Sequence, residues 1–134
     1  MKHADRTRDS RLDATDLRHL HFAPAVRSGD MLYLSGVIGA LAEGEEAGDA
    51  AYAAGTHRAF KQIEVVLGEA GAKFEDIVSM TSFHVGMGKH LGALAAVKDE
   101  YLPEPYPAWT VIGVSELFDP RGFVEIQVIA RLPE

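Results

Sequence analysis

Glu125 is the residue whose type and position point most directly to chemistry. It interrupts an apolar strand-like segment, Phe123-Val124-Glu125-Ile126. A carboxylate in such surroundings costs free energy unless it is paired or reaches water. In a partly buried cleft its pKa rises, which suits a group that takes a proton from water and returns it. The alternative that the pattern leaves open is a solvent-facing residue on the open side of a sheet.

The chain has six histidines, and their spacing gives a weak signal for metal binding. His19 and His21 would share one face of a strand and need a third ligand to hold a metal ion. His57 and His84 fall on separate elements, and no H-E-x-x-H motif accompanies them. We therefore expect no metal site, and we interpret His57 as a partly buried histidine on the inner face of a helix.

Two further motifs resemble known catalytic or cofactor signatures and depart from them. Gly86, Gly88 and Gly92 follow a strand-like segment, but the dinucleotide fingerprint G-x-G-x-x-G has one residue fewer. A single strand-helix unit also cannot form a doubly wound sheet, so we expect a turn here and no cofactor. Ser35-Gly36 lacks the G-x-S-x-G context of a nucleophilic serine, although its backbone amide can hold an anion or a carbonyl oxygen.

Composition limits the class of protein. A length of 134 residues fits one domain. The formal net charge of −7 disfavours binding to nucleic acid, which requires a basic face. No apolar run is long enough to span a membrane, and Met1 to Asp16 lacks the apolar segment of a secretory signal. With no cysteine, disulfides and thiol chemistry are excluded. We expect a cytoplasmic protein without nucleic-acid or membrane partners.

The apolar periodicity predicts one α+β domain at residues 19–134 after a flexible, mixed-charge arm at 1–18. Both helices of this domain should pack on one face of a mixed sheet. The expected order is β-β-α-β-α-β-β. It comprises strands at 19–29 and 31–34, a loop at 39–48, a helix at 50–70, a strand at 77–85, a helix at 90–101, and strands at 110–114 and 122–131.

The expected elements also predict which side chains face the core. The first helix should bury Ala53, His57, Phe60, Ile63 and Leu67, and Gly71 should end it in a left-handed conformation. The last strand should place four apolar residues on one side and Glu125, Gln127 and Ile129 on the other. Because a monomer would leave the apolar part of that second side in water, we expect self-association.

Several segments taken in order resemble the RidA/YjgF family, also called the L-PSP endoribonuclease family. They lie between about Ala25 and Arg131 and comprise Gly29-Asp30-Met31-Leu32-Tyr33-Leu34-Ser35-Gly36, Glu69-Ala70-Gly71-Ala72, Asp76-Ile77-Val78, Pro107-Ala108 and Val124-Glu125-Ile126-Gln127-Val128-Ile129-Ala130. The resemblance implies a chorismate-mutase-like α+β fold and a homotrimer with small-molecule clefts between subunits. It also implies cofactor-free hydrolysis of enamines and imines to keto acids and ammonia, in which an arginine holds the substrate carboxylate and a glutamate orients water.

Carried over residue by residue, the resemblance assigns Glu125 as the catalytic glutamate. It assigns substrate binding to the Ser35-Gly36 turn, to Thr110 and Val111, where a backbone amide faces the cleft, and to the neighbouring Tyr106 and Trp109. Trp109 stands where the family has its arginine, and an aromatic ring cannot clamp a carboxylate as a guanidinium does.

Two further replacements make the expected cleft more apolar. Phe22 takes the place of a pocket tyrosine, and Pro24 falls where a glutamine is common. Arg27 and Arg121 are the candidates to supply the missing cation from another strand.

The sequence leaves four functions to weigh. The first is a divergent trimeric protein that binds, and hydrolyses, a small neutral or aromatic metabolite with Glu125 handling water. The second is an imine deaminase that uses another cation, and the third is a non-catalytic module that binds or senses a metabolite. Cleavage of RNA is the fourth, and the acidic net charge argues against it.

Overall fold

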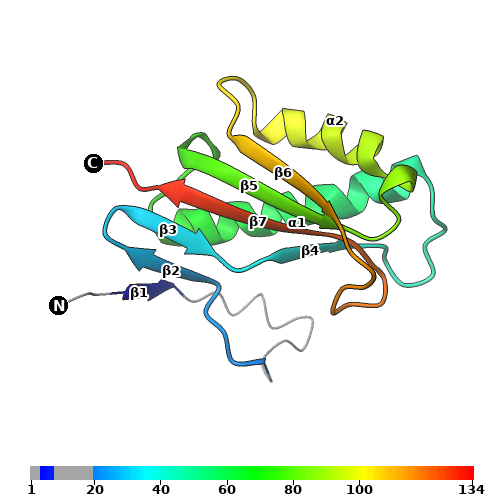
Figure 1. The fold of residues 1–134 in the computed structure, drawn as a ribbon, viewed down its shortest axis with the longest axis horizontal. Helices are drawn as coiled ribbons and strands as arrows, with labels where there is room; N and C mark the ends of the chain where they lie inside the picture. The colour runs from blue at the N-terminus through cyan, green and yellow to red at the C-terminus, as the bar shows by residue number, and fades with distance from the viewer. Residues whose placement is uncertain (1–3, 8–19) are drawn as a thin grey trace.

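The computed structural model describes residues 4–7 and 20–134, which form a mixed β-sheet covered on one face by two helices (Figure 1). The strands are β1 (Ala4–Thr7), β2 (Ala25–Ser28), β3 (Met31–Leu34), β4 (Val37–Ala40), β5 (Ile77–His84), β6 (Ala108–Gly113) and β7 (Gly122–Arg131). Most of the expected arm at 1–18 lies outside the described residues, and within it Ala4–Thr7 pairs antiparallel with β2.

Strand β7 is the centre of the sheet. Strand β5 runs antiparallel along one of its edges, and β6 lies parallel to β5 as the outermost strand on that side. The other edge of β7 pairs with two strands in succession, β3 at Ile129–Arg131 and β4 at Gly122–Ile126. The sheet order is therefore β1-β2-β3-β7-β5-β6, with β4 on β7 beyond the end of β3.

The Ser35-Gly36 turn separates β3 from β4. The backbone amide of Ser35 donates to Pro24 O at 2.9 Å, and its hydroxyl donates to Ala23 O at 2.7 Å. These bonds turn the chain away from the β7 ladder for two residues before it pairs again. The sequence predicted a loop from residue 39 and no strand here, so the existence of β4 corrects that prediction.

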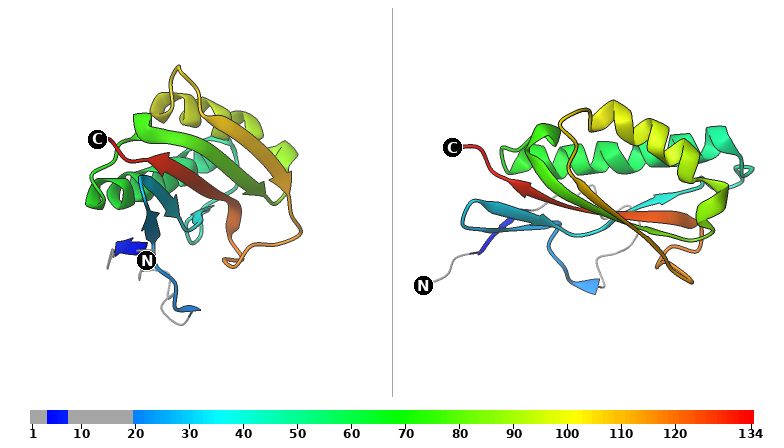
Figure 2. Two further views of the ribbon diagram at one scale, coloured as in Figure 1. Left: turned by 60° about the vertical axis from the view of Figure 1, so that its left-hand side comes forward. Right: turned by 45° about the horizontal axis from the view of Figure 1, so that its top comes forward.

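Helices α1 (Asp49–Glu69) and α2 (Leu91–Tyr101) both lie on one side of the sheet (Figure 2). Their observed bounds agree with the predicted ones to within one residue at each end. Gly71 follows α1 with φ +80°, and the amide of Ala72 donates to Leu67 O at 2.9 Å, which completes the expected left-handed termination. The α+β prediction is confirmed.

The inner face of α1 is rotated from the predicted one. Tyr52, Thr56 and Val66 are buried, whereas Ala53 and His57 are only partly buried. The reason is that α1 also contacts β4, the strand that the sequence did not predict, so its buried face includes the side toward β4.

The core lies between the helices and the apolar face of β7. Val124, Ile126, Val128 and Ala130 have no exposed surface, and the opposite face carries Glu125, Gln127 and Ile129, as the alternation predicted. In β5 a register shift between Ile77 and Ser79 interrupts the alternation that places Met80, Ser82 and His84 on the buried side. Ile77 is buried and Val78 is 45% exposed.

Helix α1 approaches β4 so closely that Gly55 has no room for a side chain. A Cβ at this position would lie 2.7 Å from both Ala40 O and Phe123 Cε2. We predict that Gly55→Ala lowers the free energy of unfolding by about 1–3 kcal/mol, measured by urea denaturation.

Gly68 in the same helix is the matched control, because a Cβ there meets no atom within 4 Å. Gly68→Ala should raise stability by about 0.5–1 kcal/mol through helix propensity. Equal effects of the two substitutions would contradict the close approach of α1 and β4.

Candidate functional site

Glu125 lies in the middle of β7 on the face of the sheet that the helices do not cover. Its cross-strand neighbours are Ile38 of β4 and Phe83 of β5, and the carboxyl group is partly buried between these two apolar residues. Burial raises the pKa of the Glu125 carboxyl above its ordinary value. A carboxyl group with a raised pKa exchanges protons more readily near neutral pH, which is the property that the sequence analysis assigned to it.

The side chain of Glu125 packs against Gly36. A Cβ on Gly36 would lie 2.7 Å from both Cγ and Cδ of Glu125, well inside van der Waals contact. Gly36 follows Ser35, whose two hydrogen bonds to the 23–24 segment fix the turn. Because Gly36 has no side chain, the Glu125 carboxyl group has room to lie beside the turn.

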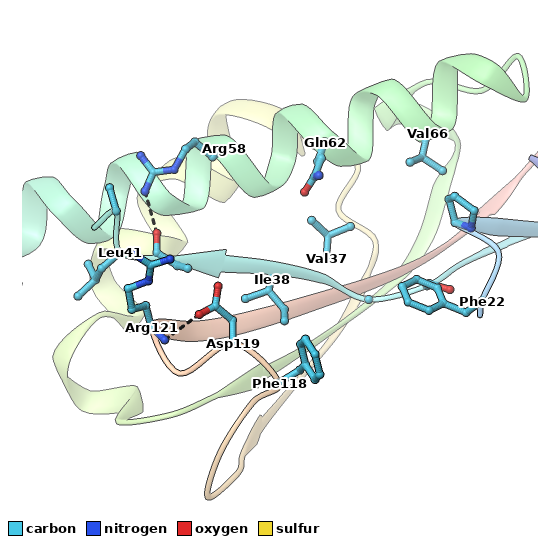
Figure 3. A pocket seen from close by; sticks show the side chains of 15 residues that line it. Phe22, Val37, Ile38, Leu41, Arg58, Gln62, Val66, Phe118, Asp119 and Arg121 are labelled. Carbon is cyan, nitrogen blue, oxygen red and sulfur yellow. Dashed lines mark hydrogen bonds between the residues drawn. The ribbon is translucent and has the colours of Figure 1, made fainter. Parts of the chain in front are cut away.

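A pocket of about 300 Å³ opens along the unpaired edge of β4 (Figure 3). One wall is α1, through Arg58, Gln62 and Val66, and the opposite wall is the loop that precedes β7. The floor is the chain from the Ser35-Gly36 turn to the residues after β4, and Phe22 lies at the turn end.

The pocket brings together one part of the predicted site. Phe22, Ser35 and Gly36 line it, and Glu125 packs against Gly36. Its walls are completed by Arg121 and by five residues that no sequence signal marked as site residues, Arg58, Gln62, Val66, Phe118 and Asp119. No motif marks these residues, because they come from a helix face and a loop that meet only in the folded chain.

Trp109 does not join Glu125 within one protomer. It is the register partner of Met80, and its indole Nε1–H donates to Ser82 Oγ at 2.8 Å. Met80 and Ser82 are buried on the helix side of β5, whereas Phe83, the register partner of Glu125, points to the open side. Within one chain, strand alternation therefore puts Trp109 and Glu125 on opposite faces of the sheet.

The ring of Trp109 has a structural partner in Lys98. The Lys98 Nζ lies 4.8 Å from the Trp109 ring centroid and 5.1 Å from that of Tyr106. Lys98 is only 6% exposed and also contacts Asp99 Oδ1 at 3.2 Å. Cation–π contacts to two rings offset part of the cost of burying an ammonium group.

Thr110 and Val111 lie on β6, the last strand of the sheet in the order given above, and neither lines the pocket. By register Thr110 shares the open face with Thr81 and Gln127, and Val111 is on the helix side with Ser82. Both β6 residues are exposed. They face solvent in the described chain.

A buried chain of hydrogen bonds continues from Trp109 into the protein. Ser82 Oγ lies 2.7 Å from His84 Nε2, and His84 Nδ1 lies 2.9 Å from His90 Nε2. Every bond is satisfied when Trp109 donates to Ser82, Ser82 to His84, and His84 to His90, with both imidazoles neutral. His90 Nδ1 is buried without a hydrogen-bond partner among the described residues.

These contacts establish the histidine geometry that the sequence left open. His84 pairs with His90 and not with His57, whose Nδ1 lies 2.9 Å from the Tyr101 hydroxyl. His57 is partly buried, as expected. His19 lies outside the described residues, and within residues 4–7 and 20–134 no group of three or more histidine, aspartate or glutamate side chains could hold a metal ion. Neither described helix is long and apolar enough to cross a membrane.

The two buried histidines predict a pH dependence of stability. Burial and the neighbouring His84 lower the pKa of His90 from 6.5 to about 4. The unfolded chain therefore binds the proton more tightly. Stability is complete above pH 6.5 and should fall by about 3 kcal/mol as the pH drops to about 4.

Denaturation measured between pH 7 and pH 4 checks this dependence. His90→Asn should flatten the decline, whereas the same change at the exposed His21, whose φ of +52° asparagine tolerates, should leave it unchanged. An identical pH profile for the His90 variant and the wild type would show that His90 does not carry the effect.

Comparisons with known proteins agree with this fold. The family model described as Endoribonuclease L-PSP matches residues 16–132. The chain is 38% identical over 115 residues to the RutC family protein YjgH of Escherichia coli (strain K12), covering 84% of each. It is 31% identical over 108 residues to a 2-iminobutanoate/2-iminopropanoate deaminase of Dermatophagoides farinae, covering 81% of this chain and 83% of the relative.

Solved structures have the same architecture. A YjgF-family protein from Mycobacterium tuberculosis superposes with a TM-score of 0.79 at 23% identity, over 97% of this chain and 100% of the other. A structure of the protein YJGH gives a TM-score of 0.75 at 34% identity, over 96% and 92%. With the family model matching most of the sequence and these folds in agreement, the chain belongs to the RidA/YjgF family, the L-PSP endoribonuclease family.

Proposed function

We propose that this protein is a homotrimer that binds a small metabolite containing an imine or enamine and hydrolyses it without a cofactor. The observation that carries the proposal is the Glu125 carboxyl, which is half-buried, has a raised pKa and packs against a glycine that lines a pocket. A carboxyl group in this setting can take a proton from water and return it to nitrogen.

The chemistry needs only water and this carboxyl group. The Glu125 carboxylate accepts a proton as the water oxygen bonds to the C=N carbon, and the nitrogen is protonated to give a carbinolamine. The carbinolamine then loses its C–N bond, and ammonia leaves while the hydroxyl oxygen becomes the carbonyl oxygen of the product. The Ser35 amide already donates to Pro24 O, so the backbone amide of Gly36, the residue against which the carboxyl group packs, is the candidate to hold a polar atom of the substrate.

The trimer is part of the proposal because one chain does not bring all of the expected cleft residues together. Thr110 and Val111 lie on β6 and do not line the pocket beside Glu125. The uncovered side of the protomer also exposes large side chains, with Tyr33 46% and Ile112 38% exposed. A neighbouring chain seated on the open face would cover this surface and bring its own β6 toward Glu125.

The deaminase relative supports the proposed reaction. The orientation of Trp109, whose indole N–H points to Ser82, favours the alternative, which is a non-catalytic binding module. With its N–H bonded to Ser82 and its ring against Lys98, Trp109 supplies no cation to hold a carboxylate beside the C=N carbon. Turnover of short imino acids should therefore be slow. Tight ligand binding without turnover would identify the binding module.

The test is ammonia release from imines that an amino-acid oxidase generates from leucine and phenylalanine. We predict that the wild-type protein accelerates release over buffer and that Glu125→Gln removes the acceleration, a loss of about 100-fold or more. The variant should retain a light-scattering mass three times the 14.5 kDa of the chain.

Glu116→Gln is the matched control, since Glu116 is an exposed carboxylate that is not among the residues lining the pocket. It should leave both rate and mass unchanged. Full activity of the Glu125 variant would refute its role in handling water, and a monomeric wild-type protein would refute the shared cleft.

A further inference from the structure

The pocket has a cationic end that the proposed reaction does not use. Arg58 and Arg121 line it together, and Figure 3 shows both guanidinium groups around Leu41. Arg58 Nη2 donates to Ala40 O at 2.7 Å and lies 3.7 Å from Glu45 Oε1, so it is held in place and partly neutralised. The guanidinium of Arg121 has no ion pair or hydrogen bond to another residue within the described part of the chain.

The charges around this end favour an anion. Asp119 is the one carboxylate among the lining residues, and its Oδ1 accepts the backbone N–H of Arg121 at 2.9 Å, which disperses its negative charge. Because Glu45 lies against Arg58, the Arg121 guanidinium is the charge at this end that has no ion-pair partner among the described residues. A free guanidinium at the rim of an apolar pocket binds a carboxylate through charge-assisted, bidentate hydrogen bonds.

The cationic end is far from Glu125. The Ser35-Gly36 turn begins the floor of the pocket, and Leu41, whose amide donates to Arg121 O at 3.1 Å, lies at the other end. Gly36 and Leu41 are five residue steps apart along nearly extended chain, which is roughly 16 Å. The side chains between the two ends are mainly apolar, with Ile38 on the floor and Phe118 on the loop wall.

We propose that Arg121 binds the anionic end of an elongated, largely apolar ligand whose other end reaches Gly36 and Glu125. The inference rests on the proposed function in taking the Gly36 end as the reacting end. It implies that the best substrate has its acid group several carbons away from the C=N bond, and that 2-imino acids, in which the two are adjacent, are turned over more slowly. Arg121 then makes up for the cation that position 109 does not provide.

The experiment compares two probes with one carbon skeleton, 4-phenylbutanoate and 4-phenylbutan-1-ol, by isothermal titration calorimetry on the intact protein. We expect the wild type to bind the acid about tenfold more tightly than the alcohol. Arg121→Gln should remove this preference by weakening the acid alone, and Arg121→Lys should restore part of it. Phe118→Ala should weaken both probes equally, because it removes an apolar wall.

Arg27→Gln is the matched control, since Arg27 is an exposed arginine outside the pocket whose Nε donates to Gly29 O. It should leave both affinities unchanged. Equal binding of acid and alcohol to the wild type, or a preference that survives Arg121→Gln, would overturn the assignment. Because the readout is binding, Glu125→Gln should leave the preference intact, so failure of the hydrolysis proposal is distinguishable from failure of this one.

Discussion

The contact between the Glu125 carboxyl and the bare Cα of Gly36 is the constraint on which the site depends. A carboxyl group between Ile38 and Phe83 loses much of its hydration, and the space that remains for it lies against the one residue type without a side chain. The turn that carries Gly36 is fixed by the two hydrogen bonds of Ser35. The same turn splits one edge of the sheet into β3 and β4, and the free edge of β4 becomes the pocket.

The two faces of the sheet carry different kinds of residue: the helix face carries contacts that stabilise the fold, and the open face carries Glu125. On the helix face, polar groups are used to hold the protein together, since Trp109, Ser82, His84 and His90 satisfy one another in a buried chain. On the open face Glu125 is accessible from outside the core, and the neighbouring residues are suited to contact another subunit. Trp109 also contributes to the helix face, because its ring contacts Lys98 of α2 and so joins β6 to that helix.

Much of the fold could be predicted from the sequence because its signals are local. The alternation of β7, the two helices and the glycine at 71 follow from periodicity and from backbone preference, and all four agree with the structure. Strand β4 could not be predicted, because one of its four residues is Gly39 and glycine disfavours a strand. The glycine is required by close packing against Val124, which is a tertiary contact.

The candidate site was likewise predictable only in part. Glu125 and Gly36 were predicted by resemblance and meet in the structure. The inward orientation of Trp109 depends on its pairing with β5, and the convergence of Arg58 with Arg121 depends on how α1 packs. Both arrangements depend on tertiary contacts, which no local sequence pattern encodes.

The most direct measurement of the central claim is the titration of the Glu125 side-chain carboxyl carbon, followed by NMR in the wild-type protein. Partial burial between Ile38 and Phe83 against Gly36 predicts a pKa above the ordinary glutamate value of 4.5. A pKa at or below 4.5 would show that water reaches this carboxyl freely, and it would contradict the account of how the fold prepares Glu125 for proton transfer.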